Sequence, residues 1–321
     1  MVKSIAIPIL FLPDYCPTGG PADIATRALS AALNEMGVEH RLREAKTWDG
    51  TLGSIAVVNG WTKKLLDRVG APTRNDVIKA HRAAGRDVLC IERGYLGDRR
   101  EWHGISWNGF CSNGGNFRTD GVSPDRWIRL KDRIGVEFQH RGTCPTRQSP
   151  ILLCGQVPWD AQVDNGNHIQ WLEETIGQIA MNTDRPIQFR PHPKAYRRHD
   201  PYGELSRDFR RRCGNPALGV DPHTSFEMDL ATCAALVCFN SNVATLGIMA
   251  GVPVFTASDS NADPIAFRLD KGDASALDNP PCPCMERRAS RETQRERWAW
   301  ELAYKQWHTD EMGAAWLHLT R

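Results

Sequence analysis

The stretch 234–256 constrains the fold of this chain more than any other. It reads AALVCF, then NSN, then VATLGIMAG, then VPVFT. The first run predicts a buried strand over 234–239, because it is too short and too β-branched for a helix. A helix over 243–250, closed by Gly251, and a strand over 252–256 follow. This order indicates a parallel βαβ unit, and ligands of such sheets bind beside the carboxyl ends of the strands.

A second strand end lies upstream, in the segment PIQFRPHPK. Residues 187–190 predict a short strand that stops at Pro191-His192-Pro193, because proline donates no hydrogen bond to a ladder and keeps the preceding residue extended. His192 and Ser241 therefore follow two strands of the same predicted sheet. Two polar turns at the carboxyl edge of one sheet indicate a ligand site.

These segments resemble the nucleotide-binding half of GT-B glycosyltransferases. RPHP and FNSNVATLGIMAGVPVF are similar to the HP motif and the serine motif of the sialyltransferase-like and Kdo-transferase-like groups. They look most like the glycosyltransferase-like proteins of bacteriophages that modify DNA. The resemblance implies an α/β fold of GT-B type, in which two Rossmann-like domains with parallel sheets face each other across a cleft.

The length of 321 residues suffices for two domains with separate cores. Residues 1–135 are expected to form an N-terminal Rossmann-like acceptor domain, since predicted strands alternate with helices there. The breakers in 123–150 predict an interdomain region. A donor domain is expected over 150–285, and the resemblance implies that helices in 286–321 pack back across the domain join.

Four strands are predicted in the first domain, over 4–12, 38–42, 54–59 and 88–91, with helices over 22–36 and 75–84. In the second domain, a strand over 151–154 and a helix over 167–181 precede RPHP. No G-x-G-x-x-G follows the first strand, which argues against a dinucleotide site of that type.

Composition indicates a globular protein, with 41% hydrophobic and 24% charged residues. No apolar run reaches membrane-span length and the N-terminus lacks a cleavage signal, so we expect a cytoplasmic protein, in the host cytoplasm if it is phage-encoded. The ten cysteines form no C-x-x-C pair and are expected to be free thiols. A membrane partner is not expected, and the oligomeric state stays open.

A general base is expected at the end of the strand over 88–91. Glu92 follows this strand, and the segment Glu92-Arg93-Gly94 resembles the acidic-x-Gly segment of the related families, although Arg93 replaces a second acid. Asp23 and Asp14 are fallback bases. Alternatively, Glu92 is a structural partner of nearby arginines. The sequence contains no D-x-D, so we expect a metal-independent reaction with no metal site, and a one-step displacement would invert the sugar carbon.

The donor is expected to be a nucleotide sugar, with a UDP-sugar favoured over a CMP-sugar and no further cofactor. Phosphate groups need hydrogen-bond donors and positive charge, which strand-end residues of the second domain offer. The predicted donor-binding residues are Gln156, Arg190, His192, Lys194, Asn240, Ser241 and Asn242.

Two loops and an aromatic segment of the first domain are candidate acceptor contacts. The glycines before the first helix, Gly19 and Gly20, leave backbone N–H groups near its positive end. The segment WHGISWNGFCSNGGNFR, residues 102–118, is expected to be irregular and to stack on a sugar or base. The alternative is a twisted hairpin whose tryptophans fill the core. The candidate acceptor residues are Gly19, Gly20, Arg93, Tyr95, Trp107 and Asn108.

A cluster of arginines between residues 190 and 213 suits a phosphate-rich partner, either a nucleotide or DNA; the alternative is a solvated face of ion pairs. Transfer to a hydroxymethylated pyrimidine of phage DNA is the leading hypothesis. The other hypotheses are a surface-polysaccharide glycosyltransferase, a UDP-sugar 2-epimerase-like enzyme and a DNA-binding accessory protein without activity.

Overall fold

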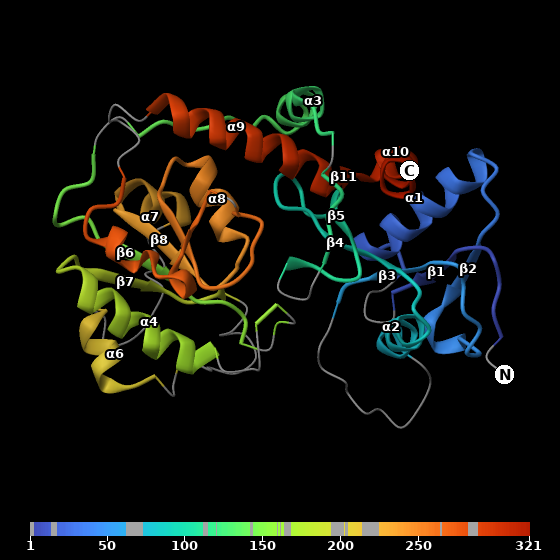
Figure 1. Ribbon diagram of the computed structural model, residues 1–321, viewed down its shortest axis with the longest axis horizontal. Coiled ribbons are helices and arrows are strands. Elements are labelled where there is room, and N and C mark those ends of the chain that lie inside the picture. The colour runs from blue at the N-terminus through green and yellow to red at the C-terminus, as the bar shows by residue number, and fades with distance from the viewer. Residues whose placement is uncertain are drawn as a thin grey trace. The chain divides into compact units, whose positions relative to one another are not determined.

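The protein consists of two compact units (Figure 1). One comprises Met1–Ile134 with Trp300–Arg321, and the other comprises Gly135–Ala299. The computed structural model describes residues 3–13, 18–61, 73–111, 115–119, 121–141, 144–158, 160, 162–163, 168–193, 202, 205–213, 225–263, 265–281 and 288–321, with side chains of the last range from residue 293.

The first unit has a six-stranded mixed sheet of order β11-β5-β4-β3-β1-β2. β1, β2, β3 and β4 pair in parallel, whereas β5 pairs antiparallel with both β4 and β11. Its elements are β1 (Ile9–Leu12), α1 (Pro21–Glu35), β2 (Arg41–Glu44), β3 (Ala56–Asn59), α2 (Arg74–Ala83), β4 (Val88–Arg93), β5 (Trp102–Trp107), α3 (Pro124–Ile134), β11 (Gln306–His308) and α10 (Met312–Thr320).

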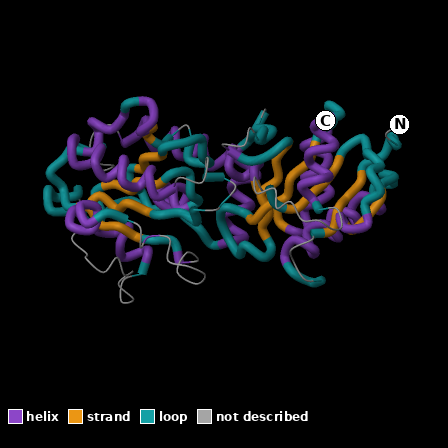
Figure 2. Tube along the Cα trace, turned by 90° about the horizontal axis from the view of Figure 1, so that it is seen from below, coloured by secondary structure: helices purple, strands orange, loops and turns teal. Residues whose placement is uncertain are grey.

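Alternation along the strands gives this sheet two buried faces, because successive side chains of a strand point to opposite sides. Leu10 belongs to the cluster that includes α1 and α10, whereas its neighbours Ile9 and Phe11 belong to the cluster that includes α2. Burial on both faces is typical of parallel strands. In each unit the strands lie between helices (Figure 2).

The second unit has a five-stranded sheet of order β10-β9-β8-β6-β7, in which every pairing is parallel. Its elements are β6 (Ile151–Cys154), α4 (His168–Asn182), β7 (Ile187–Arg190), α6 (Arg207–Arg212), α7 (Phe226–Thr232), β8 (Ala235–Cys238), α8 (Val243–Met249), β9 (Val254–Thr256) and β10 (Phe267–Arg268), and α9 (Arg288–Lys305) runs from this unit into the first.

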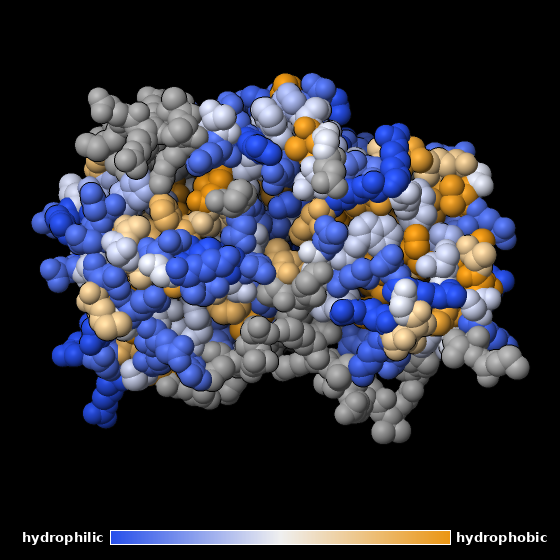
Figure 3. All heavy atoms as spheres, in the orientation of Figure 1, coloured by the Kyte–Doolittle hydropathy of each residue, from blue (hydrophilic) through white to orange (hydrophobic). Residues whose placement is uncertain are grey.

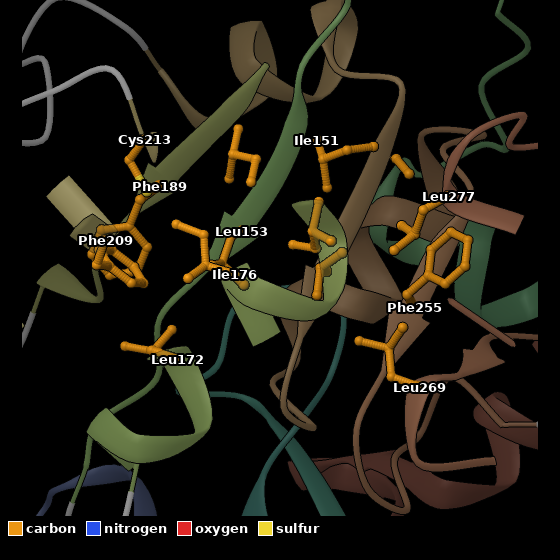
Figure 4. Packing of buried hydrophobic residues seen from close by; sticks show 14 of the residues in the cluster. Ile151, Leu153, Leu172, Ile176, Phe189, Phe209, Cys213, Phe255, Leu269 and Leu277 are labelled. Atoms are coloured by element: carbon orange, nitrogen blue, oxygen red, sulfur yellow. The ribbon is translucent and has the colours of Figure 1, made fainter. Parts of the chain in front are cut away.

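The core of the second unit lies between α4 and one face of its sheet (Figure 4). Leu153 of β6 meets Ile176 of α4 at the centre, and Phe189 with Phe209 fills one side. The helix α8 lies against the opposite face. A Cβ at Gly247 of α8 would come within 2.9 Å of the Val254 side chain, so only glycine allows this close approach.

The predicted elements of the second unit are confirmed to within two residues, and those of the first unit less closely. The strand expected over 4–12 is limited to Ile9–Leu12, and the one expected over 38–42 lies at Arg41–Glu44. The strand β2 reads RLRE and is mostly exposed, whereas the apolar Val38 precedes it, and a proline precedes Ile9, so hydrophobicity alone misplaced these two strands.

One expectation for the first unit is wrong, and two others omit an element. Residues 102–107 form the regular strand β5, with Trp102 buried at 3% exposure, so the hairpin alternative holds for this part. The expected interdomain region contains α3, which begins at Pro124, because proline is tolerated in the first turn of a helix. The terminal segment contains the strand β11 as well as two helices.

Arg126 of α3 holds the terminal segment in the first unit. Its guanidinium donates to the carbonyl oxygens of Ala303 at 2.6 Å and Gln306 at 2.8 Å, pairs with Glu311 at 3.0 Å, and lies 3.5 Å from the ring centroid of Trp307. Burial lowers the pKa of Arg126, and the carboxylate of Glu311 opposes this effect. The buried charge of Arg126 is therefore compensated by two carbonyl oxygens, a carboxylate and an aromatic ring.

Most described cysteines are free and buried, as expected, including Cys90, Cys154 and Cys238. Cys144 departs from this expectation because its sulfur is bonded in a disulfide. Across the described ranges, no helix combines the length and the apolar character that a membrane span requires. On the face drawn in Figure 3, hydrophilic side chains predominate and apolar ones are scattered.

Candidate functional site

Three strands of the second unit end in register, and each is followed by a polar residue at the same distance. Cys154 of β6 pairs with both Arg190 of β7 and Cys238 of β8. Two positions beyond these strand ends lie Gln156, His192 and Asn240. Because the strands are parallel, the three turns share one edge of the sheet. The structure thus brings together three of the residues that the sequence selected.

Gln156 connects the turn after β6 to the turn after β8. Its side-chain amide donates to Asn240 Oδ1 at 3.0 Å, and its Oε1 accepts the backbone N–H of Asn240 at 3.5 Å. Asn240 also donates to the carbonyl oxygen of Gln162 at 2.8 Å. Both amides are buried, so these bonds satisfy groups that would otherwise be costly to bury. A direct donor contact by either residue stays a prediction.

His168, the first residue of α4, holds the backbone of the same turn. Its Nε2 accepts the N–H of Gln156 at 2.8 Å, and its ring stacks on Trp171 with centroids 5.1 Å apart. Burial, and to a smaller extent the nearby His192, lower the pKa of His168 to about 4. The ring is therefore neutral at neutral pH.

Tyr202 connects the turns after β6 and β7. Its hydroxyl donates to the Gln156 carbonyl at 3.0 Å and accepts the backbone N–H of His192 at 3.3 Å. A Cβ at Gly155 would lie 2.7 Å from this hydroxyl, so glycine is required for the approach. The ring of Tyr202 is fully buried and packs edge-on against Phe189. The position of His192 thus depends on a residue from the crossover between β7 and α7.

Ser241 and Asn242 lie at the start of α8, next to Asn240. The Ser241 carbonyl accepts the N–H of Ala244 at 3.0 Å, and its hydroxyl accepts the N–H of Val243 at 3.5 Å. Asn242 is the N-cap residue. Both residues are partly exposed, as is His192. These three residues therefore have surface at the edge where Gln156 and Asn240 form the framework.

Arg190, a predicted donor-binding residue, forms an ion pair with Asp229 of α7. Asp229 is buried at 3% exposure and also accepts from the Gln188 side chain at 2.9 Å. The positive charge of Arg190 is thus compensated inside the protein, which weakens the expected phosphate contact. Lys194 lies outside the described residues.

Among the candidate bases of the first unit, Glu92 lies at the carboxyl end of β4 with an exposed side chain. The partner residue on β5 is Gly104, and the backbone N–H of Arg93 approaches Glu92 Oε1 at 3.3 Å. Arg100, one of the alternative partners, pairs with Asp98 instead, at 2.9 Å. The catalytic role of Glu92 stays a prediction.

Asp23 has a structural role in the glycine loop before α1. One carboxylate oxygen accepts the N–H of Gly19 at 2.9 Å, and the other accepts from Arg27 at 2.9 Å. Burial raises the pKa of Asp23, but the hydrogen bonds from Arg27 and Gly19 outweigh it and leave the pKa lowered. A lowered pKa makes Asp23 a weaker base. The N–H of Gly19 was expected to be free, but it donates to Asp23. Gly20 is the N-cap of α1. Asp14 lies outside the described residues.

Three predicted acceptor residues are used by the fold. Trp107 pairs with Leu89 near the amino end of β4, and the Asn108 side chain accepts the N–H of Val88 at 2.9 Å. Both therefore lie at the edge opposite Glu92, and their contact with an acceptor stays a prediction. Tyr95 is buried at 9% exposure, with its hydroxyl 3.0 Å from where a Cβ of Gly104 would be. Arg93 is exposed.

Three of the four arginines of α6 make local contacts. Arg211 and Arg212 both pair with Asp208, and Arg210 donates to the carbonyl oxygen of Leu205 at 3.2 Å. These contacts match the alternative of a solvated face of ion pairs. In the ranges that the structure describes, no group of three or more His, Cys, Asp or Glu residues is arranged to hold a metal ion.

His168 and Tyr202 are the site residues that sequence reasoning missed. His168 opens a helix that follows a strand and a polar loop, which is a usable signal for a residue at a strand end. Tyr202 lies in the long crossover, where neither periodicity nor a motif marks it. Its contact with Gln156 depends on the tertiary fold alone.

No family model matches the sequence, and no curated protein matches it. Two solved structures are similar to it over nearly their whole length. The KpsC beta Kdo 2,7 transferase of Thermosulfurimonas dismutans is 12% identical with a TM-score of 0.51, covering 98% of this chain and 100% of that one. The KpsC beta Kdo 2,4 transferase of the same organism is 13% identical with a TM-score of 0.52, covering 92% and 90%.

A UDP-GlcNAc 2-epimerase of Methanocaldococcus jannaschii covers 80% of this chain and 85% of its own, at 12% identity, but its TM-score of 0.32 supports no conclusion. The two KpsC structures are too distant in sequence to show more than the fold. They agree with the two sheets dominated by parallel strands described above. The chain therefore has the α/β architecture of GT-B proteins.

Proposed function

We propose that this protein is a glycosyltransferase that binds a nucleotide-sugar donor at the carboxyl edge of the second sheet. The supporting observation is the register of β6, β7 and β8, which places three polar turns at one edge and fixes them through Gln156 and Tyr202. Parallel α/β sheets bind nucleotides at such edges. A preorganised edge binds a ligand without the cost of ordering loops.

The residues with exposed surface there are assigned to the leaving phosphate. His192 and Ser241 carry hydrogen-bonding side chains, and Asn242 adds an amide. Donors aimed at the leaving group stabilise the negative charge that develops on it during transfer. Glu92 is assigned as the base that takes the proton of the acceptor hydroxyl. A one-step displacement by this hydroxyl inverts the sugar carbon and needs no metal ion.

UDP is the favoured nucleotide and CMP the alternative. Both similar structures are named as Kdo transferases, so a Kdo donor belongs in the test. A saccharide acceptor is the choice of the surface-polysaccharide hypothesis. The DNA acceptor, a hydroxymethylated pyrimidine, remains part of the proposal from sequence, but the ion pairs of Asp208 with the arginines of α6 reduce its support.

The test is calorimetric titration of UDP, CMP, GDP and their sugar conjugates. We expect one nucleotide to bind and His192→Ala to weaken its affinity at least roughly tenfold, which corresponds to the ~1.4 kcal/mol of a charge-assisted hydrogen bond. His140→Ala, at an exposed histidine of the same unit, should leave the affinity unchanged. Wild-type protein that binds none of these compounds would refute the donor site.

Transfer is then assayed with the nucleotide sugar that binds. Glu92→Gln should keep the donor affinity within about threefold and lower turnover by roughly 10²-fold or more, because it removes a general base without removing a donor contact. Saccharide and hydroxymethylated DNA acceptors are compared side by side. Turnover of Glu92→Gln equal to that of the wild type would remove Glu92 from the mechanism.

A further inference from the structure

A buried histidine underlies the turn after β6, although no predicted contact to a ligand involves it. His168 is 0% exposed, and its Nε2 accepts the Gln156 N–H at 2.8 Å. An imidazole nitrogen accepts a hydrogen bond only when it carries no proton, so the neutral ring carries its proton on Nδ1. Loss of the ring would leave the Gln156 N–H buried without an acceptor, which is costly.

Gln156 links the turn after β6 to the turn after β7 and the turn after β8. All four polar groups of Gln156 are engaged: the N–H by His168, the carbonyl by Tyr202, and the side-chain amide twice by Asn240. Tyr202 in turn accepts the N–H of His192 at 3.3 Å. A shift at the Gln156 N–H therefore reaches both the turn after β7 and the turn after β8.

We propose that His168, acting through Gln156, is a positioning residue for nucleotide binding by His192, Ser241 and Asn242. The inference rests on the proposed function for the identity of the ligand. His168 stays the neutral Nδ1–H tautomer in the free and the nucleotide-bound protein. Of the described residues, His192 is the titratable group whose charge acts on His168, and the hydrogen bond from the Gln156 N–H keeps His168 Nε2 without a proton.

The first unit supplies a matched control. His81 of α2 is also 0% exposed, and its Nε2 accepts the N–H of Gly53 at 3.1 Å. Gly53 precedes β3, so it lies on the amino-end side of the first sheet, away from the strand ends expected to bind ligands. The two histidines thus make the same kind of hydrogen bond, His168 at the carboxyl edge of the second sheet and His81 at the amino edge of the first.

The test measures nucleotide affinity by calorimetry, with the nucleotide that the wild type binds. We expect His168→Leu to weaken it at least tenfold, His168→Gln to stay within threefold because its amide oxygen restores an acceptor, and His81→Leu to leave it unchanged. Equal weakening by His168→Leu and His81→Leu, or no rescue by His168→Gln, would overturn the positioning role. Unchanged affinity in His168→Leu would do the same.

Two further readouts apply if His168→Leu does not fold. The ¹⁵N spectrum of wild-type histidines should show His168 as the neutral Nδ1–H tautomer with and without nucleotide, and a protonated ring would contradict the inference. Hydrogen exchange of His168→Gln over 155–158 and 240–242 should remain close to that of the wild type. Wild-type protein that binds nucleotide while His168 is dispensable refutes this inference alone, whereas wild-type protein that binds none refutes the proposed function and this inference with it.

Discussion

The carboxyl ends of the parallel strands are built differently in the two units. In the second unit, β6, β7 and β8 end in register and leave three polar turns side by side. In the first unit, the segment after β4 turns back into antiparallel β5, and the side chain of Gln306 accepts the N–H groups of Tyr95 at 2.6 Å and Leu96 at 2.9 Å.

This difference shows why one set of site predictions came together and the other did not. A polar residue beyond a parallel strand stays at the edge when the next strand is also parallel, because the chain must leave the sheet to return. Where an antiparallel strand follows, the chain folds back along the sheet and uses its own side chains for packing. Tyr95, Trp107 and Asn108 are used in this way, whereas His192 and Ser241 are not.

The largest effect is expected from removing the contacts by which Arg126 holds the terminal segment in the first unit. Arg126→Ala should lower the free energy of unfolding by about 3–5 kcal/mol, because it leaves Glu311 and two backbone carbonyls without their buried partner. Urea unfolding measures this loss. Arg129→Ala, at an exposed arginine of the same helix, should change it by less than about 0.5 kcal/mol. A similar loss in both variants would show that the buried contacts of Arg126 contribute no more to stability than those of an exposed arginine.

A pH titration compares the two units directly, because each contains a histidine whose pKa burial lowers to about 4: His103 in the first unit and His168 in the second. Such a group takes up a proton more readily in the unfolded chain, so stability is fully present above the ordinary value of 6.5 and is lost as pH falls towards 4. Each histidine contributes up to roughly 3 kcal/mol to this loss.

Unfolding free energies measured from pH 7 to pH 4 test this expectation. His168→Gln and His103→Gln should each flatten the acid side of the curve, because neither amide titrates. Curves that superimpose on that of the wild type would mean that neither ring is kept neutral by the fold. A flattened curve for one variant alone would show that only that unit keeps its histidine neutral.

The smallest effect on stability is expected from a substitution in the second unit, Tyr202→Phe. Tyr202→Phe removes the hydroxyl that joins Gln156 to His192 and should cost about 1–2 kcal/mol of stability, the contribution of two hydrogen bonds. Nucleotide affinity should fall as well, since the turn after β7 loses its link. Tyr304→Phe, in the first unit, is the control. Thermal unfolding and calorimetry distinguish the outcomes, and unchanged affinity would remove Tyr202 from the site.

The sequence by itself determined the elements of the second unit. Short β-branched runs between Pro186 and Thr256 are bounded by proline, NSN and Gly251, and each boundary has a local steric cause. The strand, the polar turn and the helix are therefore encoded within a few residues. This local coding also explains why His192, Asn240 and Ser241 could be placed at strand ends without any knowledge of tertiary contacts.

Only the tertiary structure decided how the remaining residues are used. Gln306 and Arg126 join segments far apart in the chain, and Tyr202 reaches Gln156 from a crossover without periodicity. Buried polar groups must find partners wherever the fold brings them, and composition does not reveal which partner is near. Strand direction after β4 is likewise a property of the whole sheet. Hydrophobic pattern and turn-forming residues determine which helices and strands form. The need to satisfy buried hydrogen bonds determines which partners their polar side chains contact.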